Sequence, residues 1–306
     1  MNDSEKQLDL KLAQVQTIFS PQDLLALKMN KEYIKKYYKV NKWAYSLFHT
    51  FSHRMYMGVT RGGGYKEEDL LEAARFVEKY TLELKATNVL ELATGRGANS
   101  SYLALKFPSV NFFGLDISKG QLDYAFKSSK KIKNYHPSLG DYHDLSRFPN
   151  NHFEIVFVVE ALCYSTEKEK VLREVHRVLK KGGVFIIFDG YISKKDNELT
   201  QNELLAKKLT ERGMAVSRFE TYKEFLEKVR KGKFRVVYEE NVSQYILPTL
   251  YRFERLSEGF FRKKLLAKVI KRTFPKEFVN NSISGLLMPE LVKLKLGLYY
   301  ITILKK

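Results

Sequence analysis

Short runs of apolar residues recur along the chain, and several are followed by a segment whose apolar residues repeat every three or four positions. The run Ile155–Val159 has no polar alternation, which is typical of a parallel strand buried on both faces. Val171–Leu179 then has the spacing of an amphipathic helix, and Gly182 and Gly183 predict its end. This order indicates an α/β fold. The strands predicted in this way are Asn88–Glu91, Asn111–Asp116, Ile155–Val159, Val184–Asp189, Phe234–Glu239 and Leu298–Leu304.

Aromatic residues are concentrated before the first predicted strand. Between Tyr33 and Tyr56 they recur at spacings near three and four, which predicts an amphipathic helical segment. Three consecutive glycines in Thr60–Gly64 are expected to separate an N-terminal helical cap, residues 1–64, from the core. The aromatic side chains either pack this cap internally or form the wall of an apolar substrate pocket. Polar candidates at the mouth of such a pocket are His49, His53 and Tyr56.

A long segment separates the last two predicted strands. We expect residues 65–240 to form a core, 241–297 an insertion that completes the substrate cap, and 298–306 the last core strand, because a connection of this length needs its own structure. Within the insertion, Phe260–Lys276 has seven basic residues and no acid. It predicts a basic amphipathic helix that either lies on an anionic membrane or packs on its own domain. The apolar positions of that helix are Phe261, Leu265, Leu266, Val269 and Ile270.

The turn after the first strand carries the clearest chemical signal. Gly95 and Gly97 lack a Cβ atom, so a ligand can approach the backbone there and meet free N–H groups. Asp116 ends the second strand about 20 residues later, where it can accept hydrogen bonds from ribose hydroxyls. The pattern predicts an adenosine-type cofactor, although a glycine turn alone is also compatible with an ordinary strand–helix connection. Ser100 stands where a dinucleotide fingerprint has glycine or alanine, which disfavours a pyrophosphate-containing cofactor.

The segment Glu91-Leu-Ala-Thr-Gly-Arg-Gly97 resembles the acidic-x-x-x-Gly-x-Gly motif of class I S-adenosylmethionine-dependent methyltransferases. Gly140-Asp141-Tyr142 and Asn151–Val156 resemble the third-strand exit and the fourth-strand start of the same family, and the likeness covers about residues 85–190. The sterol, tocopherol and quinone methyltransferases are the most similar in type. The resemblance implies a seven-stranded, mostly parallel, doubly wound, Rossmann-like sheet with a helical cap, and S-adenosyl-L-methionine as the cofactor.

The resemblance also implies roles for individual residues. Glu91, Gly95 and Gly97 would hold the methionine portion of the cofactor, Asp116 the ribose, and Ile117, Asp141 and Tyr142 the adenine. The remaining cofactor contacts that it implies are Ala93, Thr94, Gln121 and Glu160.

Candidate catalytic residues follow from the fourth strand and the cap. Glu160-Ala-Leu-Cys-Tyr164 resembles the Glu-Ala-Thr-Cys-His segment of sterol C-methyltransferases, with Tyr164 in place of the histidine. Glu160, Tyr164 and His53 are therefore the catalytic candidates, and each also has a purely structural interpretation. No metal site is predicted, because Asp189 lacks an accompanying Asp-Asp-Asn cluster. Cys163 is interpreted as a small core residue.

Charge and composition change this picture only slightly. The chain has 53 Lys and Arg against 35 Asp and Glu, a net charge of +18, which favours anionic partners or reflects lysines spread over solvated faces. No run of about 18 apolar residues occurs, so no membrane span is expected. The N-terminal residues lack the form of a secretory signal, and a single cysteine favours a reducing compartment. We expect a cytoplasmic location, with peripheral membrane contact through 260–276 as an option.

Three functions remain open at this stage. The first is methyl transfer to a hydrophobic small molecule or lipid, such as a sterol, prenylquinone or phospholipid, by in-line displacement in a capped pocket. The second is an RNA or protein methyltransferase that uses the basic surface, but an Asn/Asp-Pro-Pro-Tyr-like tetrapeptide is missing after the fourth strand, which makes nucleic acid a less favoured partner. The third is a catalytically silent binder recruited to membranes. The oligomeric state is left open.

Overall fold

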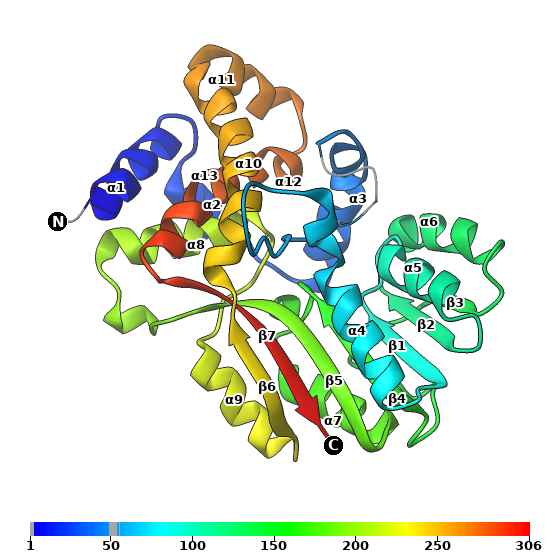
Figure 1. Ribbon diagram of the computed structural model, residues 1–306. Coiled ribbons are helices and arrows are strands. Elements are labelled where there is room, and N and C mark those ends of the chain that lie inside the picture. The colour runs from blue at the N-terminus through cyan, green and yellow to red at the C-terminus, as the bar shows by residue number, and fades with distance from the viewer. Residues whose placement is uncertain (1–2, 49–53, 55) are drawn as a thin grey trace.

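The computed structural model describes residues 3–48, 54 and 56–306 of the chain. Within these ranges it describes the side chains of all residues except 42–48. In this part of the chain, seven strands form one mixed sheet in the order β3-β2-β1-β4-β5-β7-β6 (Figure 1). Only the pairs β5–β7 and β7–β6 are antiparallel, so the predicted fold class is confirmed. The strands are β1 (Asn88–Leu92), β2 (Asn111–Asp116), β3 (Tyr135–Leu139), β4 (Phe153–Val159), β5 (Leu179–Ile192), β6 (Arg235–Asn241) and β7 (Gly297–Lys305).

Helices cover both faces of the sheet because successive strand residues point to opposite sides. Ile155 and Phe157 contact the layer of α4 (Glu72–Glu83), α5 (Ala98–Lys106) and α6 (Lys119–Ser129). Val156 and Val158, between and beside them, contact the opposite layer of α7 (Lys168–Val178) and α9 (Tyr222–Lys231). The uninterrupted apolar run in β4 is therefore explained by burial on both faces. Short 3₁₀ turns are η1 (Glu67–Leu71), η2 (Leu162–Tyr164) and η3 (Asp196–Glu198).

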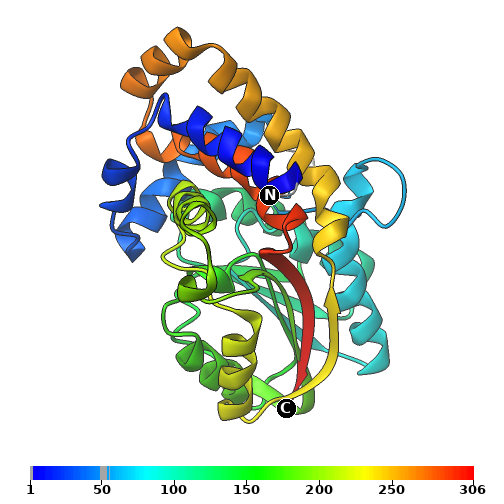
Figure 2. The same cartoon turned by 90° about the vertical axis from the view of Figure 1, so that its left-hand side faces the viewer.

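A helical cap lies over one edge of the sheet (Figures 1 and 2). Leu8, Leu209 and Leu286 belong to one buried cluster, so helices from the start, middle and end of the chain pack as a single layer. The cap contains helices from the predicted N-terminal segment and from the late insertion, together with α8, which follows β5. Its helices are α1 (Asp3–Gln16), α2 (Pro21–Leu25), α3 (Lys31–Phe48), α8 (Gln201–Gly213), α10 (Ser243–Arg262), α11 (Lys264–Thr273), α12 (Lys276–Val279) and α13 (Asn281–Lys293).

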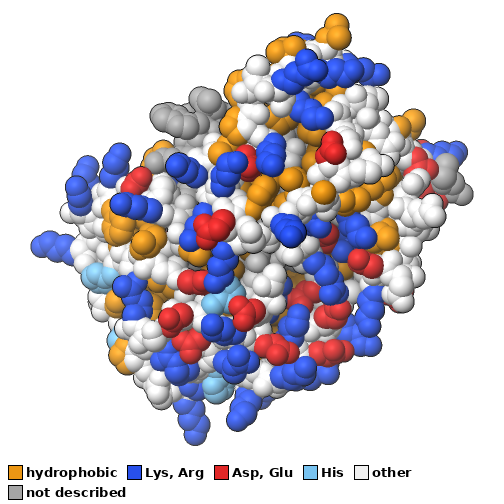
Figure 3. Space-filling model, turned by 180° about the vertical axis from the view of Figure 1, so that it is seen from behind, with side chains coloured by type: hydrophobic (Ala, Val, Ile, Leu, Met, Phe, Trp, Pro, Cys, Tyr) orange, Lys and Arg blue, Asp and Glu red, His pale blue; other side chains and the backbone are white. Residues whose placement is uncertain are grey.

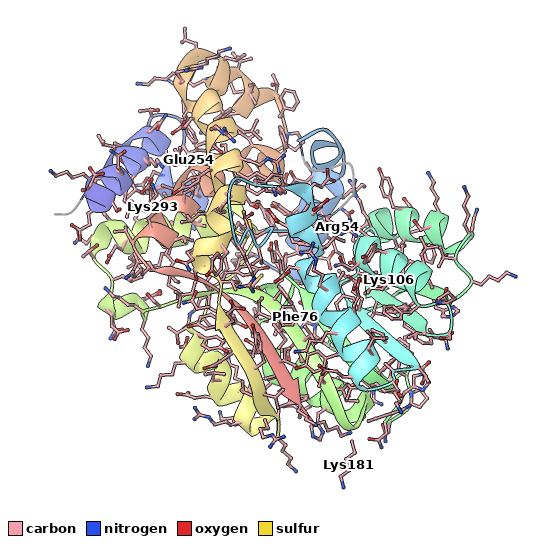
Figure 4. The ribbon with its side chains drawn as sticks, viewed as in Figure 1. Arg54, Phe76, Lys106, Lys181, Glu254 and Lys293 are labelled. Carbon is pink, nitrogen blue, oxygen red and sulfur yellow. The ribbon has the colours of Figure 1, made fainter. Side chains whose placement is uncertain are left out.

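Buried charges tie α1 to the late helices. Lys11 of α1 forms ion pairs with Glu254 of α10 and with Glu290 of α13, and Lys293 lies 2.7 Å from the same Glu290 carboxylate. Figure 4 shows Glu254 and Lys293 at this junction. Because an unpaired buried charge is costly, the four side chains hold these helices in one arrangement.

Three predicted boundaries were wrong. The helix α7 ends at Val178, and β5 begins at Leu179 and continues through the double glycine. A Cβ atom on Gly183 would lie 2.9 Å from the Glu154 carbonyl oxygen, so the glycine permits close strand approach rather than ending a helix. The aromatic helix α3 ends at Phe48, and Tyr56 lies in a bend.

The third wrong boundary concerns Phe260–Lys276, which is not one helix. The helix α10 ends at Arg262 and α11 begins at Lys264, and Lys263 between them has φ −96° and ψ 66°. The apolar periodicity continues across this break, which is why the sequence predicted a single helix.

Gly97→Ala is expected to destabilise the fold. Gly97 has φ +76°, and an added Cβ would lie 2.3 Å from the Tyr135 hydroxyl, so strain and overpacking together should lower the free energy of unfolding by about 2–4 kcal/mol. Denaturant titration measures this change. Gly62→Ala is the control, since nothing lies within 4 Å of its added Cβ and its φ is not left-handed. Equal stability of the two variants would contradict the prediction.

Candidate cofactor and substrate site

The turn after β1 is organised around a buried carboxylate. The Thr94 hydroxyl donates to Glu91 Oε2 at 2.6 Å and the Ser100 hydroxyl donates to the same oxygen at 2.5 Å. Burial raises the pKa of Glu91, while these hydroxyls and Asn99 oppose the rise. Ala93 and Gly95 both have left-handed φ values, of 53° and 57°. The carboxylate thus holds a strained turn in one conformation.

Asp116 links the ends of β1 and β2. Its Oδ2 accepts a hydrogen bond from the Gly95 N–H at 2.8 Å, and its Oδ1 accepts one from the Ser118 N–H at 2.7 Å. Burial raises the pKa of Asp116 to about 6. Each carboxylate oxygen has further lone pairs. The side chain can therefore accept hydrogen bonds from two ligand hydroxyls without releasing the loop.

A cavity of about 130 Å³ lies over these strand ends. We call it the cofactor cavity. Nine of the predicted cofactor-binding residues line it: Glu91, Ala93, Thr94, Gly95, Asp116, Ile117, Gln121, Tyr142 and Glu160. Other lining residues include Ile34, Tyr38, Tyr56, Arg96, Ala98 and Asn99.

Two predicted cofactor residues lie outside this lining. Gly97 lies at the start of α5, where the absence of a Cβ atom leaves room for the Tyr135 hydroxyl. Asp141 accepts a hydrogen bond from Lys31 Nζ at 2.8 Å and lies 2.6 Å from His143 Nδ1. Although burial opposes the shift, Lys31 and His143 lower the pKa of Asp141 to about 2. The contacts described here are packing and ion pairing, and the contact of these two residues with the cofactor stays a prediction.

Arg96 is a lining residue that the sequence did not indicate, because the position between the two glycines carries no constraint in the motif. It is buried, its Nε donates to Gln121 Oε1 at 3.2 Å, and its guanidinium lies 4.4 Å from the centre of the Tyr124 ring. Its contact with Gln121 connects the glycine turn to α6.

A larger cavity of about 430 Å³ lies between the sheet edge and the cap helices. We call it the cap cavity. Its walls are mostly apolar and come from α3, α8, α10, α13, β5 and β7, with Ile246, Phe253, Met288, Leu291 and Tyr299 among them. Tyr38, Glu160 and Tyr164 line both cavities. The two cavities are therefore neighbours that share a wall.

Glu160 is the charged member of the shared wall. It follows β4 with a left-handed φ of 49°, and its Oε1 accepts hydrogen bonds from the Met57 N–H at 2.6 Å and the Tyr299 hydroxyl at 2.8 Å. Burial is the main cause that raises its pKa to about 7. No hydrogen bond reaches Oε2 from the described residues. A carboxyl group half ionised at neutral pH, in a cleft, is typical of a proton acceptor.

The other catalytic candidates differ in their surroundings. The Tyr164 hydroxyl donates to the Met214 carbonyl oxygen at 3.2 Å, and its ring meets the Tyr38 ring edge-on. Tyr56 lines the cofactor cavity and donates to Asn99 Oδ1 at 2.5 Å. His49 and His53 lie outside the described residues.

Cys163 and Asp189 lie at the floor of the cap cavity. Asp189 accepts a hydrogen bond from the Cys163 N–H at 2.9 Å, and burial, with the nearby Asp189, raises the pKa of the Cys163 thiol. That thiol is therefore a poor nucleophile. Within the described ranges, no three His, Cys, Asp or Glu side chains gather as metal ligands. Nor does any helix there have the length and apolarity needed to cross a bilayer.

Comparison with known proteins identifies the family. A family profile described as a methyltransferase domain matches residues 83–244, more than half of the chain. The chain belongs to this methyltransferase family. Its fold is shared with the mycolic acid cyclopropane synthase CmaA1, solved with SAH and CTAB, at a TM-score of 0.70, 14% identity, and coverage of 89% of this chain and 97% of that one.

Curated methyltransferases resemble parts of the chain. It is 34% identical over 113 residues to the demethylmenaquinone methyltransferase of Thermotoga maritima, covering 37% of this chain and 48% of that protein. It is 28% identical over 169 residues to the sterol 24-C-methyltransferase erg-4 of Neurospora crassa, covering 52% and 42%. The chain thus spans about half the length of these relatives.

The cofactor of this methyltransferase is S-adenosylmethionine, and the donors and acceptors of the cofactor cavity fit it. Asp116 has lone pairs for ribose hydroxyls, and the buried carboxyl groups of Glu91, Asp116 and Glu160 favour a ligand with positive charge.

Asp116→Ala is expected to weaken S-adenosylmethionine binding by about 1–3 kcal/mol, because charged hydrogen bonds to the ribose would be lost. Isothermal titration calorimetry measures the affinity. Glu227→Gln, on the exposed face of α9, is the control, and its affinity should match that of the unchanged protein. Unchanged affinity in Asp116→Ala would show that Asp116 does not hold the ribose.

Proposed function

We propose that this methyltransferase transfers a methyl group from S-adenosylmethionine to a hydrophobic small molecule or lipid held in the cap cavity. The observation that carries the proposal is the wall of Tyr38, Glu160 and Tyr164 that the two cavities share. Transfer requires the acceptor atom to lie about 3 Å from the methyl carbon. Neighbouring cavities with a common wall allow such an approach without exposure to bulk water.

The cap cavity indicates the class of acceptor. Its volume of about 430 Å³ lies within the usual range for small-molecule pockets, and its walls are largely apolar. Two relatives are named for apolar acceptors of this kind, demethylmenaquinone and a sterol. A sterol, a prenylquinone or a phospholipid-like molecule is therefore the acceptor that we propose.

A few polar groups are available to orient such an acceptor. Asn41 and Asn281 lie on the cap-cavity wall and are joined by a hydrogen bond of 2.7 Å. Thr210 on α8 lines the same cavity, and its buried hydroxyl has no hydrogen-bond partner among the described residues. These groups favour an acceptor with one or two oxygen atoms on an apolar skeleton.

When bound, S-adenosylmethionine supplies an electrophilic methyl group on a sulfonium. Tyr38 and Tyr164 limit the space between the cavities, and the apolar cap excludes water. The Met57 N–H and the Tyr299 hydroxyl hold Glu160 by Oε1. Glu160 Oε2 would then accept the proton that the acceptor atom loses as its bond to the methyl carbon forms and the carbon–sulfur bond breaks, the electron pair of that bond going to the sulfur. The charge on the carboxylate is neutralised in the same step.

A labelled methyl group tests the proposal. The protein is incubated with methyl-labelled S-adenosylmethionine and, separately, with total lipid extract, polar metabolites and bulk RNA, and label is expected in the lipid fraction. Met288→Trp should fill the cap cavity and reduce this transfer at least about tenfold, while cofactor affinity stays unchanged. Leu82→Trp, at a site 68% exposed, is the matched control. Label in RNA or in the polar metabolites, with none in lipid, would overturn the proposal.

The rate should depend on pH through Glu160. Because burial raises its folded-state pKa to about 7, the proton-accepting carboxylate is lost as pH falls below that value. We expect kcat/KM to rise with pH up to about 7 and then level off, whereas Glu160→Gln should lose about 10²-fold or more and show no such rise. Glu227→Gln, on the exposed face of α9, is the control. An unchanged pH profile in Glu160→Gln would show that Glu160 is not the proton acceptor.

A further inference from the structure

The helix α11 extends beyond the rest of the cap (Figures 1 and 2). Ala267 is its buried side chain, so the helix rests on the protein by a narrow stripe. Large apolar side chains on and beside it are exposed, by 83% for Leu265, 55% for Val269 and 52% for Phe274. Together with Leu256 and Leu266 they make up the exposed apolar set that we call the apolar ridge: Leu256, Leu265, Leu266, Val269 and Phe274.

Basic side chains surround the apolar ridge. Figure 3 shows Lys and Arg side chains beside hydrophobic ones at this end of the molecule. We call the exposed set the basic belt, and no acidic residue occurs between Phe260 and Lys276. Within the described ranges, no ion pair neutralises any member of it. The members are Arg262, Lys263, Lys264, Lys268, Arg272 and Lys276.

Two residues of the predicted apolar face do not belong to this surface. Phe261 is fully buried in α10, and Ile270 lines the cap cavity. Lys271 likewise turns inward, since its Nζ donates to the Ile18 carbonyl oxygen at 2.8 Å. The sequence was also compatible with a helix packed on its own domain. The packed stripe is narrow, however, and leaves the apolar ridge uncovered.

The apolar ridge is continuous with the cap cavity. Leu256 is 52% exposed and also lines that cavity, as do Phe260 and Ile270 on the adjoining parts of α10 and α11. One wall of the cavity therefore lies beside the ridge and the belt, and the side chains that form this wall are mainly apolar.

We propose that the apolar ridge and the basic belt dock this methyltransferase on an anionic lipid bilayer, and that a lipid acceptor passes from the bilayer into the cap cavity beside Leu256. The second part rests on the proposed function. Exposed leucines beside unpaired lysines fit a bilayer, whose headgroups are anionic and whose interior is apolar. RNA would match the lysines alone and would leave Leu265 and Val269 exposed.

Vesicle flotation tests the docking without any turnover. The full chain is mixed with vesicles of equal parts phosphatidylcholine and phosphatidylglycerol, or of phosphatidylcholine alone, and binding to the anionic vesicles is expected. Lys264→Glu/Lys268→Glu should weaken binding at least about tenfold, and Leu265→Ser/Val269→Ser should do so even at low salt. Lys181→Glu/Lys223→Glu changes the net charge equally on exposed lysines elsewhere and should bind normally.

Each contrary result has a distinct meaning. Absence of binding to anionic vesicles, or equal loss in the control variant, overturns the docking surface. Binding of RNA that depends on Lys264 and Lys268 but not on Leu265 and Val269, with no vesicle binding, assigns the belt to a nucleic acid instead. Methyl transfer to total lipid extract dispersed in detergent should be normal in all three double variants. If that transfer fails in the unchanged protein while vesicles still bind, the proposed function is wrong and the docking surface stands.

Discussion

Four carboxyl groups lie side by side at the carboxyl ends of the strands, three of them buried and that of Glu160 half-buried, and the loops of the site donate hydrogen bonds to them. Glu91, Asp116, Glu160 and Asp189 lie at or near the carboxyl ends of β1, β2, β4 and β5, which are adjacent in the sheet. Burial raises the pKa of each. Their donors are backbone N–H groups and neutral side chains. A loop that moved away would leave a buried polar group unsatisfied, which is costly.

Some of these hydrogen bonds stay within one loop, such as that from Thr94 to Glu91, and others connect separate loops. Asp116, from β2, accepts from Gly95 in the loop after β1, and Asp189, from β5, accepts from the backbone of Cys163 after β4. Glu160 reaches further, to Met57 before the core and Tyr299 in the last strand. These contacts thereby fix Glu160 in the wall that the two cavities share. A ligand with positive charge also gains most where several carboxyl groups are already desolvated.

The sequence predicted the parts of the site that depend on local rules. Gly95 and Asp116 meet because parallel strands place their carboxyl ends at one edge, and glycine marks the turn between them. It could not predict that Met57 and Tyr299 hold Glu160, since both contacts join residues more than 100 positions apart. The helix end predicted at Gly183 was wrong because a glycine after a helix and a glycine where two strands approach closely give the same local signal. The break at Lys263 left the apolar periodicity intact, so only packing revealed it.

The position of β7 has a consequence for the order of assembly. It is the last strand along the chain, yet it lies between β5 and β6, so β6 has no neighbour in the sheet until residues 297–305 arrive. The same strand brings the Tyr299 hydroxyl to Glu160 and part of the wall to the cap cavity. The glycine turn and Asp116 depend only on elements made earlier. During synthesis, every residue that lines the cofactor cavity therefore precedes β7, the strand that pairs with β6 and contributes to the cap-cavity wall.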